Sequence, residues 1–548
     1  MKYILPVFLL IFSVASNSQT PAPVSQVPRP KLIVGIAVDQ MRWDFLYRFY
    51  ERYSNDGFKR ILNGGVSCEN MTINYTPSVT GVGHATLFSG AVPAMSGITG
   101  NEWIDQLTGR SVYCVGDSTV DGVGANSPSE GKRSPRNLLV TNLADELRLA
   151  TNFQSRVIGV SLKDRAAILP SGHLANAAFW FDDPSGRFIS STYYMQQLPD
   201  WVVKFNALER PAKLVENGWT TLYPINSYKQ SDTDTAMYEG KFSGETSSAF
   251  PHDMKNIYAK NRGSLRSTPY GNTLTLEFAL AAIDAYQLGK GKATDFLTIN
   301  FASTDAVGHM FGPNSIEAED TQLRLDKDLA TLMKTLDAKV GKGQWLLFLS
   351  ADHGVSSVIG FNQRFKAPGN YSPTRQMMDS LNKVLNDEFK LPSLVRSLSN
   401  YQVNFDQNKI SSNNLDFEAI KKSTIAFLQR QPAVLHVVDI SKVGSSPLPQ
   451  HLKTMISNGY QFKRSGSIQI ILNPGWFDSP SRTGTTHGSL HLYDIHLPLL
   501  WYGWNIKPGR VTREVHMNDV APTLATMLRV QTPSGSSGNV ITEIISNK

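Results

Sequence analysis

The stretch Leu32-Ile-Val-Gly-Ile-Ala-Val38 is a continuous apolar run that stops at Asp39. A strand buried on both faces of a sheet has this composition, because neither face meets water. Similar runs, each ending near Asp, Ser, Thr, His or Gly, occupy residues 295–301, 344–350, 467–472 and 497–502. We therefore expect several buried strands of one sheet.

Segments with the apolar spacing of a helix lie between these runs, at residues 273–288, 316–336 and 518–525. In the last of them, Asn518 is expected to cap the helix and Pro522 to lie in its first turn. The alternation predicts an α/β fold with a mostly parallel central sheet flanked by helices. Such sheets bind ligands beyond the carboxyl ends of their strands, so the polar residues there are the first candidates for a site.

Two stretches interrupt the alternation. Residues 182–266 are rich in aromatic, Ser, Lys and turn residues, and residues 373–464 are helical and polar. Both are predicted to be insertions over the active-site face of one catalytic domain, which spans residues 31–548.

The first 18 residues have one cation, Lys2, then an apolar run too short to span a membrane, then small residues. This order is typical of a cleaved secretory signal, with a buried or amphipathic helix as the alternative. Residues 19–30 are a Pro-rich linker. No Cys follows the apolar run and no later run is long enough to span a bilayer. We expect a periplasmic or secreted protein without a membrane anchor.

Composition limits the other partners. Lys and Arg (53) outnumber Asp and Glu (46), but no run of five or six basic residues occurs, so no nucleic-acid partner is expected. The two cysteines, Cys68 and Cys114, are too few for a disulfide-dense scaffold or a Cys-based zinc finger. They are expected either to pair or to remain buried thiols. The sequence does not determine the oligomeric state, although a monomer is favoured.

Carboxylates and imidazoles gather at the predicted strand ends: Asp39, Asp305, His309, Asp352, His353 and His487. Any one of them alone is better explained as a helix cap or a structural residue. As a set, they offer the nitrogen and oxygen ligands that zinc prefers, and six ligands suit two open sites of three each. The other histidines, including His84, are interpreted as structural, although His491 and His496 could orient His487.

Thr80 lies in Thr76-Pro-Ser-Val-Thr80-Gly-Val-Gly-His84, where a hydroxyl residue precedes small residues and an amphipathic run. This pattern predicts a helix N-terminus, at which backbone N–H groups and the helix dipole favour an anion. Alone, Thr80 is better explained as the N-cap. Beside a metal set, it is better explained as a metal-activated nucleophile.

These motifs, with Thr99-Gly-Asn101 and Gly484-Thr-Thr-His487-Gly, resemble those of the alkaline phosphatase superfamily. The segment Ser161-Leu-Lys163-Asp-Arg165 is similar, more narrowly, to phosphate-irrepressible bacterial alkaline phosphatases with a Thr nucleophile. The resemblance runs in order from Lys31 to about Leu528. It implies a zinc hydrolase that turns phosphate monoesters into alcohol and phosphate through a phosphothreonine at Thr80.

The resemblance also implies a role for each residue. One Zn²⁺ would be held by Asp305, His309 and His487, and the other by Asp39, Asp352, His353 and Thr80. The remaining phosphate oxygens would be contacted by Asn101, Lys163 and Arg165. On spacing alone, Lys163 and Arg165 are equally well explained as surface ion pairs around Asp164. More distant members bind a third metal, Mg²⁺, and have no Lys in this role, so no Mg²⁺ is expected here.

Other activities are compatible with parts of the pattern. A nucleotide pyrophosphatase/phosphodiesterase shares the zinc ligands and the Thr nucleophile, but Lys163 and Arg165 favour a monoester, whose phosphate offers more charged oxygens. A sulfatase is excluded because neither cysteine lies in Cys-x-Pro-x-Arg. Phosphonate hydrolysis and phosphoglycerate mutation rest on the fold alone. A non-catalytic zinc-stabilised binding protein is disfavoured because Thr80 and its neighbours are retained.

Overall fold

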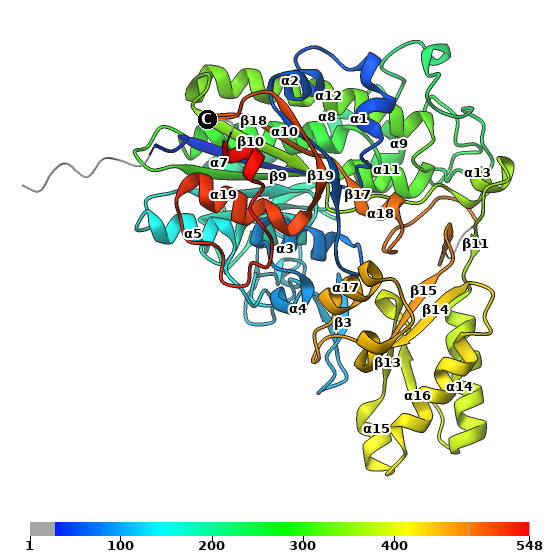
Figure 1. Cartoon of the computed structure of the whole chain (residues 1–548). Coiled ribbons are helices and arrows are strands. Elements are labelled where there is room, and N and C mark those ends of the chain that lie inside the picture. Colours follow the sequence, from blue (N-terminus) through cyan, green and yellow to red (C-terminus); the bar gives the residue numbers. More distant parts are fainter. Residues whose placement is uncertain (1–27, 480–481, 547–548) are drawn as a thin grey trace, which may run out of the picture.

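The computed structural model describes residues 28–479 and 482–546, and it has a large central sheet with helices on both faces (Figure 1). The predicted α/β class is confirmed. The predicted signal at residues 1–18 and most of the predicted linker at residues 19–30 lie outside the described residues. In the described part, no helix has the length and apolarity needed to cross a membrane.

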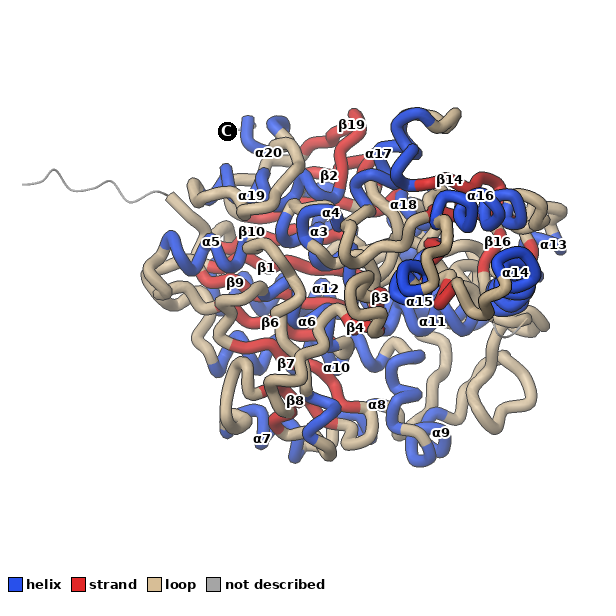
Figure 2. Tube along the Cα trace, turned by 90° about the horizontal axis from the view of Figure 1, so that it is seen from below, coloured by secondary structure: helices blue, strands red, loops and turns tan. Residues whose placement is uncertain are grey.

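The central sheet has eleven strands in the order β17-β2-β18-β10-β1-β9-β6-β7-β8-β5, with β19 also paired to β2 (Figure 2). Their bounds are β1 Leu32–Val38, β2 Val66–Thr72, β5 Gly122–Val123, β6 Val157–Ser161, β7 Ala177–Asp182, β8 Arg187–Ser191, β9 Asp295–Phe301, β10 Trp345–Ser350, β17 His496–Leu497, β18 Leu499–Gly503 and β19 Gly509–His516. The block β10-β1-β9-β6-β7 is parallel, whereas β18 and β8 pair antiparallel with its two sides. The sheet is therefore mixed and parallel mainly at its centre.

Register in this parallel block brings the predicted site residues to one edge. Ala37 of β1 pairs with Ser350 of β10 and with Asn300 of β9. All residues of β1, β9 and β10 are buried, as the apolar runs predict. The chain therefore leaves the three strands at the same level of the sheet.

Helices cover both faces of the sheet. One face has α3 Thr80–Ser89, α5 Leu143–Ala150, α6 Asp164–Ser171 and α19 Val520–Leu528, and the other has α2 Phe58–Gly64, α10 Tyr270–Ala285 and α12 Ile316–Leu336 (Figure 1). Further elements are α1 Phe45–Arg48, α4 Pro93–Ser96, α11 Ser303–Phe311, α13 Ile359–Arg364, α18 Leu492–Ile495, α20 Thr542–Ser546, β3 Glu102–Ile104, β4 Ser111–Tyr113, β11 Asn370–Tyr371 and β16 Trp476–Phe477.

Two of the predicted helices start at other residues than expected. α10 begins at Tyr270 and α19 at Val520. Pro522 lies in the first turn of α19, as predicted, but the N-cap is Asp519 and not Asn518. The Asn518 side chain instead bonds Asn74 and Ser537, at 3.1 and 3.2 Å, because a 3-10 turn over Met517–Asp519 precedes the helix.

The predicted strand at residues 467–472 forms, but in another sheet. β15 Ile468–Leu472 belongs to the four-stranded sheet β12-β13-β15-β14, with β12 Val395–Ser397, β13 Gln402–Phe405 and β14 Val434–Asp439. With α14 Thr374–Phe389, α15 Gln407–Ser412, α16 Phe417–Leu428 and α17 Gln450–Gly459, these strands form what we call the small lobe, residues 374–472 (Figure 1). β15 is fully buried because it packs in a second apolar core, so its composition could not show which sheet it joins.

The stretch at residues 182–266 contributes a strand to the central sheet, because β8 pairs antiparallel with β7. The helices α7 Asp200–Ala207, α8 Arg210–Leu214 and α9 Met254–Lys260 follow. Trp219 is fully buried and donates a 2.9 Å hydrogen bond to Asp320 of α12. Both cysteines are buried free thiols, so the pairing alternative is wrong.

Candidate active site

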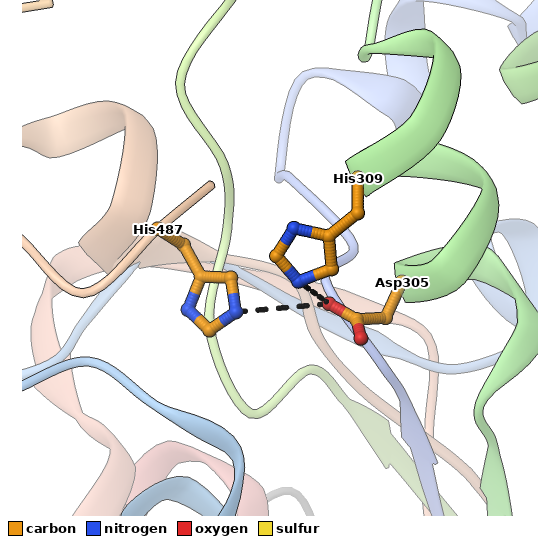
Figure 3. A group of neighbouring side chains, drawn as sticks. All are labelled: Asp305, His309 and His487. Atoms are coloured by element: carbon orange, nitrogen blue, oxygen red, sulfur yellow. Dashed lines mark ion pairs between the residues drawn. The ribbon is translucent and has the colours of Figure 1, made fainter. Parts of the chain in front are cut away.

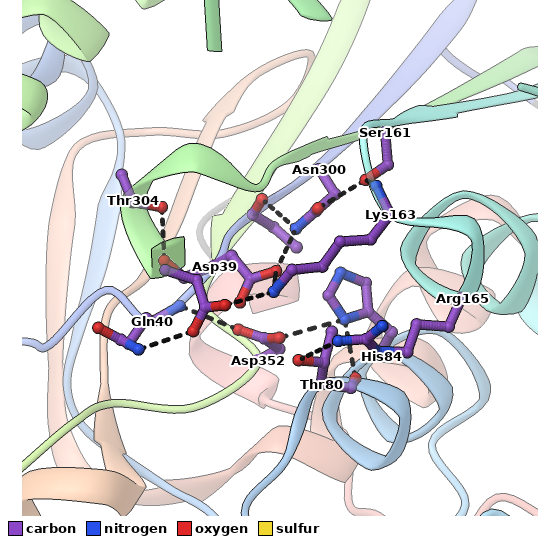
Figure 4. A network of polar contacts seen from close by, with 12 residues as sticks. Asp39, Gln40, Thr80, His84, Ser161, Lys163, Arg165, Asn300, Thr304 and Asp352 are labelled. Atoms are coloured by element: carbon purple, nitrogen blue, oxygen red, sulfur yellow. Dashed lines mark hydrogen bonds and ion pairs between the residues drawn. The ribbon is translucent and has the colours of Figure 1, made fainter. Parts of the chain in front are cut away.

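Four neighbouring strands direct polar side chains to one point at their carboxyl ends (Figure 4). Asp39 follows β1, Lys163 follows β6, Asp305 follows β9 and Asp352 follows β10. Helix α3 brings Thr80 to the same place, and the loop before α18 brings His487. The edge of the sheet thus places the predicted residues together, as ligand sites of α/β sheets require.

The first ligand set comprises Asp305, His309 and His487 (Figure 3). Asp305 Oδ1 lies 3.1 Å from His309 Nε2, one turn along α11, and 3.7 Å from His487 Nε2. His309 Nδ1 donates to the Thr485 carbonyl at 2.8 Å and His487 Nδ1 to the Ser78 carbonyl at 2.9 Å. These bonds leave each Nε2 without a proton in the neutral ring, which is the form that binds a metal.

The second predicted set is Asp39, Asp352 and His353, all fully buried. Asp39 and His353 also lie close enough to Asp305 for these three to hold a metal ion. His353 Nδ1 donates to the Gly354 carbonyl, and its Nε2 lies 3.3 Å from Asp352 Oδ2 and 3.6 Å from Asp39 Oδ1. Neither of these two carboxylate oxygens has a hydrogen-bond partner in the described part of the chain. Buried oxygens without partners are costly, so this donor set fits a cation.

The pKa shifts of residues in the two sets agree with a site for cations. Burial and the neighbouring Asp352 raise the pKa of Asp39 well above its usual value. Burial would also raise the pKa of Asp352, but His353 and His84 hold it below its usual range. Burial and the nearby His353 lower the pKa of His487, which keeps the ring neutral. Several carboxylates and imidazoles crowded into one buried cluster are typical of metal sites.

Lys163 lies between carboxylates of the two sets (Figure 4). Its Nζ is 2.8 Å from Asp39 Oδ2 and 2.6 Å from Asp305 Oδ2. Burial would lower the pKa of Lys163, but these carboxylates raise it, so the ammonium stays charged. The alternative of a surface ion pair is wrong, because Asp164 bonds Arg133 and Tyr113 instead, at 2.7 and 2.5 Å.

Thr80 is the first residue of α3, and the N-cap is Val79. The capping alternative for Thr80 is therefore wrong. Its Oγ1 lies 3.4 Å from His353 Nε2 and 3.5 Å from Arg165 Nη2. Helix α3 packs directly on the second set, since a Cβ at Gly83 would lie 2.3 Å from the Asp352 carbonyl oxygen.

Asn101 lies beside the start of α3. Its Oδ1 accepts the Gly81 N–H at 2.7 Å, which fixes the orientation of the amide. Its two amide N–H groups have no hydrogen-bond partner among the described residues and remain available to a ligand. The ten predicted site residues thus lie in one cluster.

Two further residues, Gln40 and His84, belong to this cluster, although neither is predicted from the sequence to be a site residue. Gln40 donates its side-chain amide to Asp305 Oδ1 at 2.6 Å and its backbone N–H to Asp352 Oδ1 at 3.1 Å, so it links the two sets. His84 was interpreted as structural, but its Nδ1 donates to the Thr80 carbonyl at 2.9 Å and lies 3.4 Å from Asp352 Oδ2. Its spacing of four residues from Thr80 on a helix was the available signal.

Two other histidines lie elsewhere. The ring Nε2 atoms of His491 and His496 bond the carbonyls of Leu472 and Glu69, at 3.0 and 2.9 Å. The expectation that they orient His487 is wrong, because the Ser78 carbonyl does so.

Replacing Gln40 with leucine should weaken metal retention. Loss of a group that orients metal ligands typically costs about 10- to 100-fold in affinity. Competition with a chromophoric chelator measures this directly. Gln363→Leu, on α13, is the control and should match the wild type. If Gln40→Leu and the wild type lost their metal at the same chelator concentration, Gln40 would have no part in holding the ligands.

A mixed α/β sheet with two Asp/His sets and a threonine hydroxyl at its carboxyl edge defines the alkaline phosphatase superfamily, as the sequence motifs predict. The sequence profile of the type I phosphodiesterase/nucleotide pyrophosphatase family matches residues 33–494. The chain therefore belongs to this family.

Its relatives include proteins named alkaline phosphatases. PafA of Elizabethkingia meningoseptica is 48% identical over 539 residues, which cover 98% of each chain. PhoV of Synechococcus elongatus is 52% identical over 520 residues, covering 95% of this chain and 94% of PhoV. The crystal structure of wild-type PafA matches with a TM-score of 0.93 and 49% identity, and it covers 95% of this chain and 99% of that chain.

Proposed function

We propose that the chain is a metal-dependent phosphate monoester hydrolase that works through a phosphothreonine at Thr80. The observation that supports it best is the position of the Thr80 hydroxyl, between His353 Nε2 of the second ligand set and the Arg165 guanidinium. The relatives named alkaline phosphatases, at about half identity over nearly the whole chain, support the same activity.

The metals we propose are two Zn²⁺. Asp305, His309 and His487 would hold one, and Asp39, Asp352 and His353 the other, next to Thr80. The donors are nitrogen and oxygen without sulfur, in two groups of three, which suits catalytic zinc. When bound, such cations supply Lewis acidity and neutralise charge on phosphate oxygens. No third ion, Mg²⁺, is proposed, because the Lys163 ammonium already lies between Asp39 and Asp305.

The reaction follows from the chain's own groups. Thr80 Oγ1 gives up its proton to solvent, attacks phosphorus and forms an O–P bond. The ester O–P bond breaks, and the leaving oxygen keeps the electron pair and takes a proton from solvent. Water then attacks the phosphothreonine, cleaves the Oγ1–P bond and releases phosphate. Arg165 and the free amide of Asn101 would hold the outer phosphate oxygens during both steps.

Formal charge favours a monoester over a diester. The three carboxylates of Asp39, Asp305 and Asp352 are partly offset by Lys163 and Arg165. With two divalent cations and a deprotonated Thr80, the cluster is neutral when it holds a phosphate dianion. A diester has one negative charge fewer and would leave the buried site positive, which is costly.

Replacing Arg165 with alanine tests this preference. Losing one donor to a transferring phosphoryl group costs on the order of 10²-fold. We expect such a fall in kcat/KM for phenyl phosphate and a smaller fall for its methyl diester. The wild type should hydrolyse the monoester more efficiently. Higher diester efficiency would support the phosphodiesterase alternative and overturn the proposal.

We also propose that the protein is secreted or periplasmic after cleavage near residue 18, and that it is a monomer. The predicted signal supports the first point. Signal cleavage is tested by the N-terminal mass of the protein recovered from its native host. The monomeric state is tested by sedimentation in solution. An uncleaved N-terminus or a stable dimer would contradict them.

A further inference from the structure

A groove leads from the ligand sets along the small lobe to the surface. Its inner part is a cavity of about 420 Å³ that reaches His487 and Thr486, and its outer part is a cavity of about 1140 Å³. The two share the lining residues Ser372, Thr374, Arg375 and Asp478, so they adjoin each other. β11, α13 and α14, which supply half of the residues of the outer wall, lie at the right of Figure 1.

The groove is separate from the cavity that the phosphate-contacting cations line. Lys163 and Arg165 line another cavity, of about 290 Å³, which shares no lining residue with the groove. A phosphate held by Arg165 beside Thr80 would thus direct its ester oxygen toward His487. The alcohol portion of the substrate then has the inner cavity as its path.

The chemistry of the walls changes along the groove. The inner cavity has an apolar side formed by Met377, Leu398, Ile470 and Leu472. The outer cavity contains two exposed guanidinium groups, Arg375 and Arg482, and neither forms an ion pair or hydrogen bond within residues 28–479 and 482–546.

The other charged groups of the groove are already engaged. Arg396, in the inner cavity, pairs with Asp406 at 2.9 Å and donates to the Gly109 carbonyl at 3.1 Å. Asp478, the one carboxylate among the lining residues, accepts hydrogen bonds from Thr374. The outer cavity therefore has free positive charge in excess, and free guanidinium groups bind phosphate and carboxylate oxygens.

We propose that this groove is a subsite for the alcohol portion of the ester and that it selects alcohols with a second anionic group, such as a sugar or polyol bisphosphate. The proposal rests on the phosphatase activity proposed above. The scissile phosphate lies beside Thr80, the carbon chain passes His487 along the apolar wall, and the second phosphate meets Arg375 and Arg482.

Replacing Arg375 with alanine tests the subsite, since this side chain is exposed near the start of α14 and contacts none of the ligand sets. With fructose 1,6-bisphosphate, kcat/KM should fall about 10-fold, as expected for the loss of one charge-assisted contact. With phenyl phosphate, whose ring has no second anionic group for the guanidinium to bind, kcat/KM should change less than about 2-fold. Arg482→Ala should act in the same direction.

The matched control is Arg430→Ala, which removes an exposed arginine from the small lobe outside the groove and should leave both substrates unchanged. An unchanged ratio between the two substrates in Arg375→Ala would overturn the subsite while leaving the phosphatase activity in place. If the wild type hydrolysed neither substrate, the proposed function would fail. The subsite would then be judged by the rise in Tm with fructose 1,6-bisphosphate, which Arg375→Ala must diminish. An equal rise in Tm for both proteins would overturn it.

Discussion

Thr80→Ala should reduce hydrolysis of phenyl phosphate by a factor on the order of 10³ or more, because the variant has no oxygen to form the covalent intermediate. Thr80 Oγ1 is the one hydroxyl within 3.5 Å of both His353 Nε2 and Arg165 Nη2 among the described residues. Stopped-time assays of phosphate release measure the effect.

Metal content separates a chemical role from a structural one. The six proposed Asp and His ligands are intact in Thr80→Ala, so elemental analysis should find nearly the wild-type metal content. Thr80→Ser, which restores a hydroxyl, should recover much of the turnover, and rapid quenching should trap a phosphoprotein in the wild type but not in Thr80→Ala. Turnover equal to that of the wild type would remove Thr80 from the reaction.

Asp305→Asn should have the second largest effect. Asp305 contacts His309, His487, Gln40 and Lys163, and thus connects the first ligand set to the rest of the cluster. The amide keeps the shape but removes the charge that attracts a cation and pairs with Lys163. We expect the metal content to fall from about two per chain to about one, with loss of most of the turnover.

The control for Asp305→Asn is His491→Gln. His491 is close to His487 in sequence but bonds the Leu472 carbonyl, so this variant should keep both metals. A full metal complement in Asp305→Asn would contradict the first ligand set. Loss of metal in His491→Gln would show that His491 helps to hold the metal, against the position that the structure gives it.

Much of the site could be predicted from the sequence because the sheet has a simple geometry. Apolar runs such as residues 32–38 identify buried strands, and parallel strands bring the residues after them to one edge. Asp39, Asp305 and Asp352 follow from this rule alone. The hydroxyl and small residues around Thr80 indicated a nucleophile beside the metal set, and the resemblance to a known superfamily added Asn101, Lys163 and Arg165.

The remainder depends on tertiary packing. Gln40 is an ordinary residue type, and only the close approach of Gly308, where a Cβ would lie 1.8 Å from Gln40 Oε1, shows how α11 places Asp305 against it. β15 has the composition of a central strand but joins the small lobe, because burial alone does not specify a partner. The groove likewise joins segments that are far apart in the chain.

The most direct measurement is elemental analysis of the purified protein together with its activity before and after chelation. We expect about two Zn²⁺ per chain and no stoichiometric Mg²⁺, loss of phenyl phosphate hydrolysis when the metal is removed, and recovery with Zn²⁺ alone. A metal-free protein that remained fully active would contradict the account.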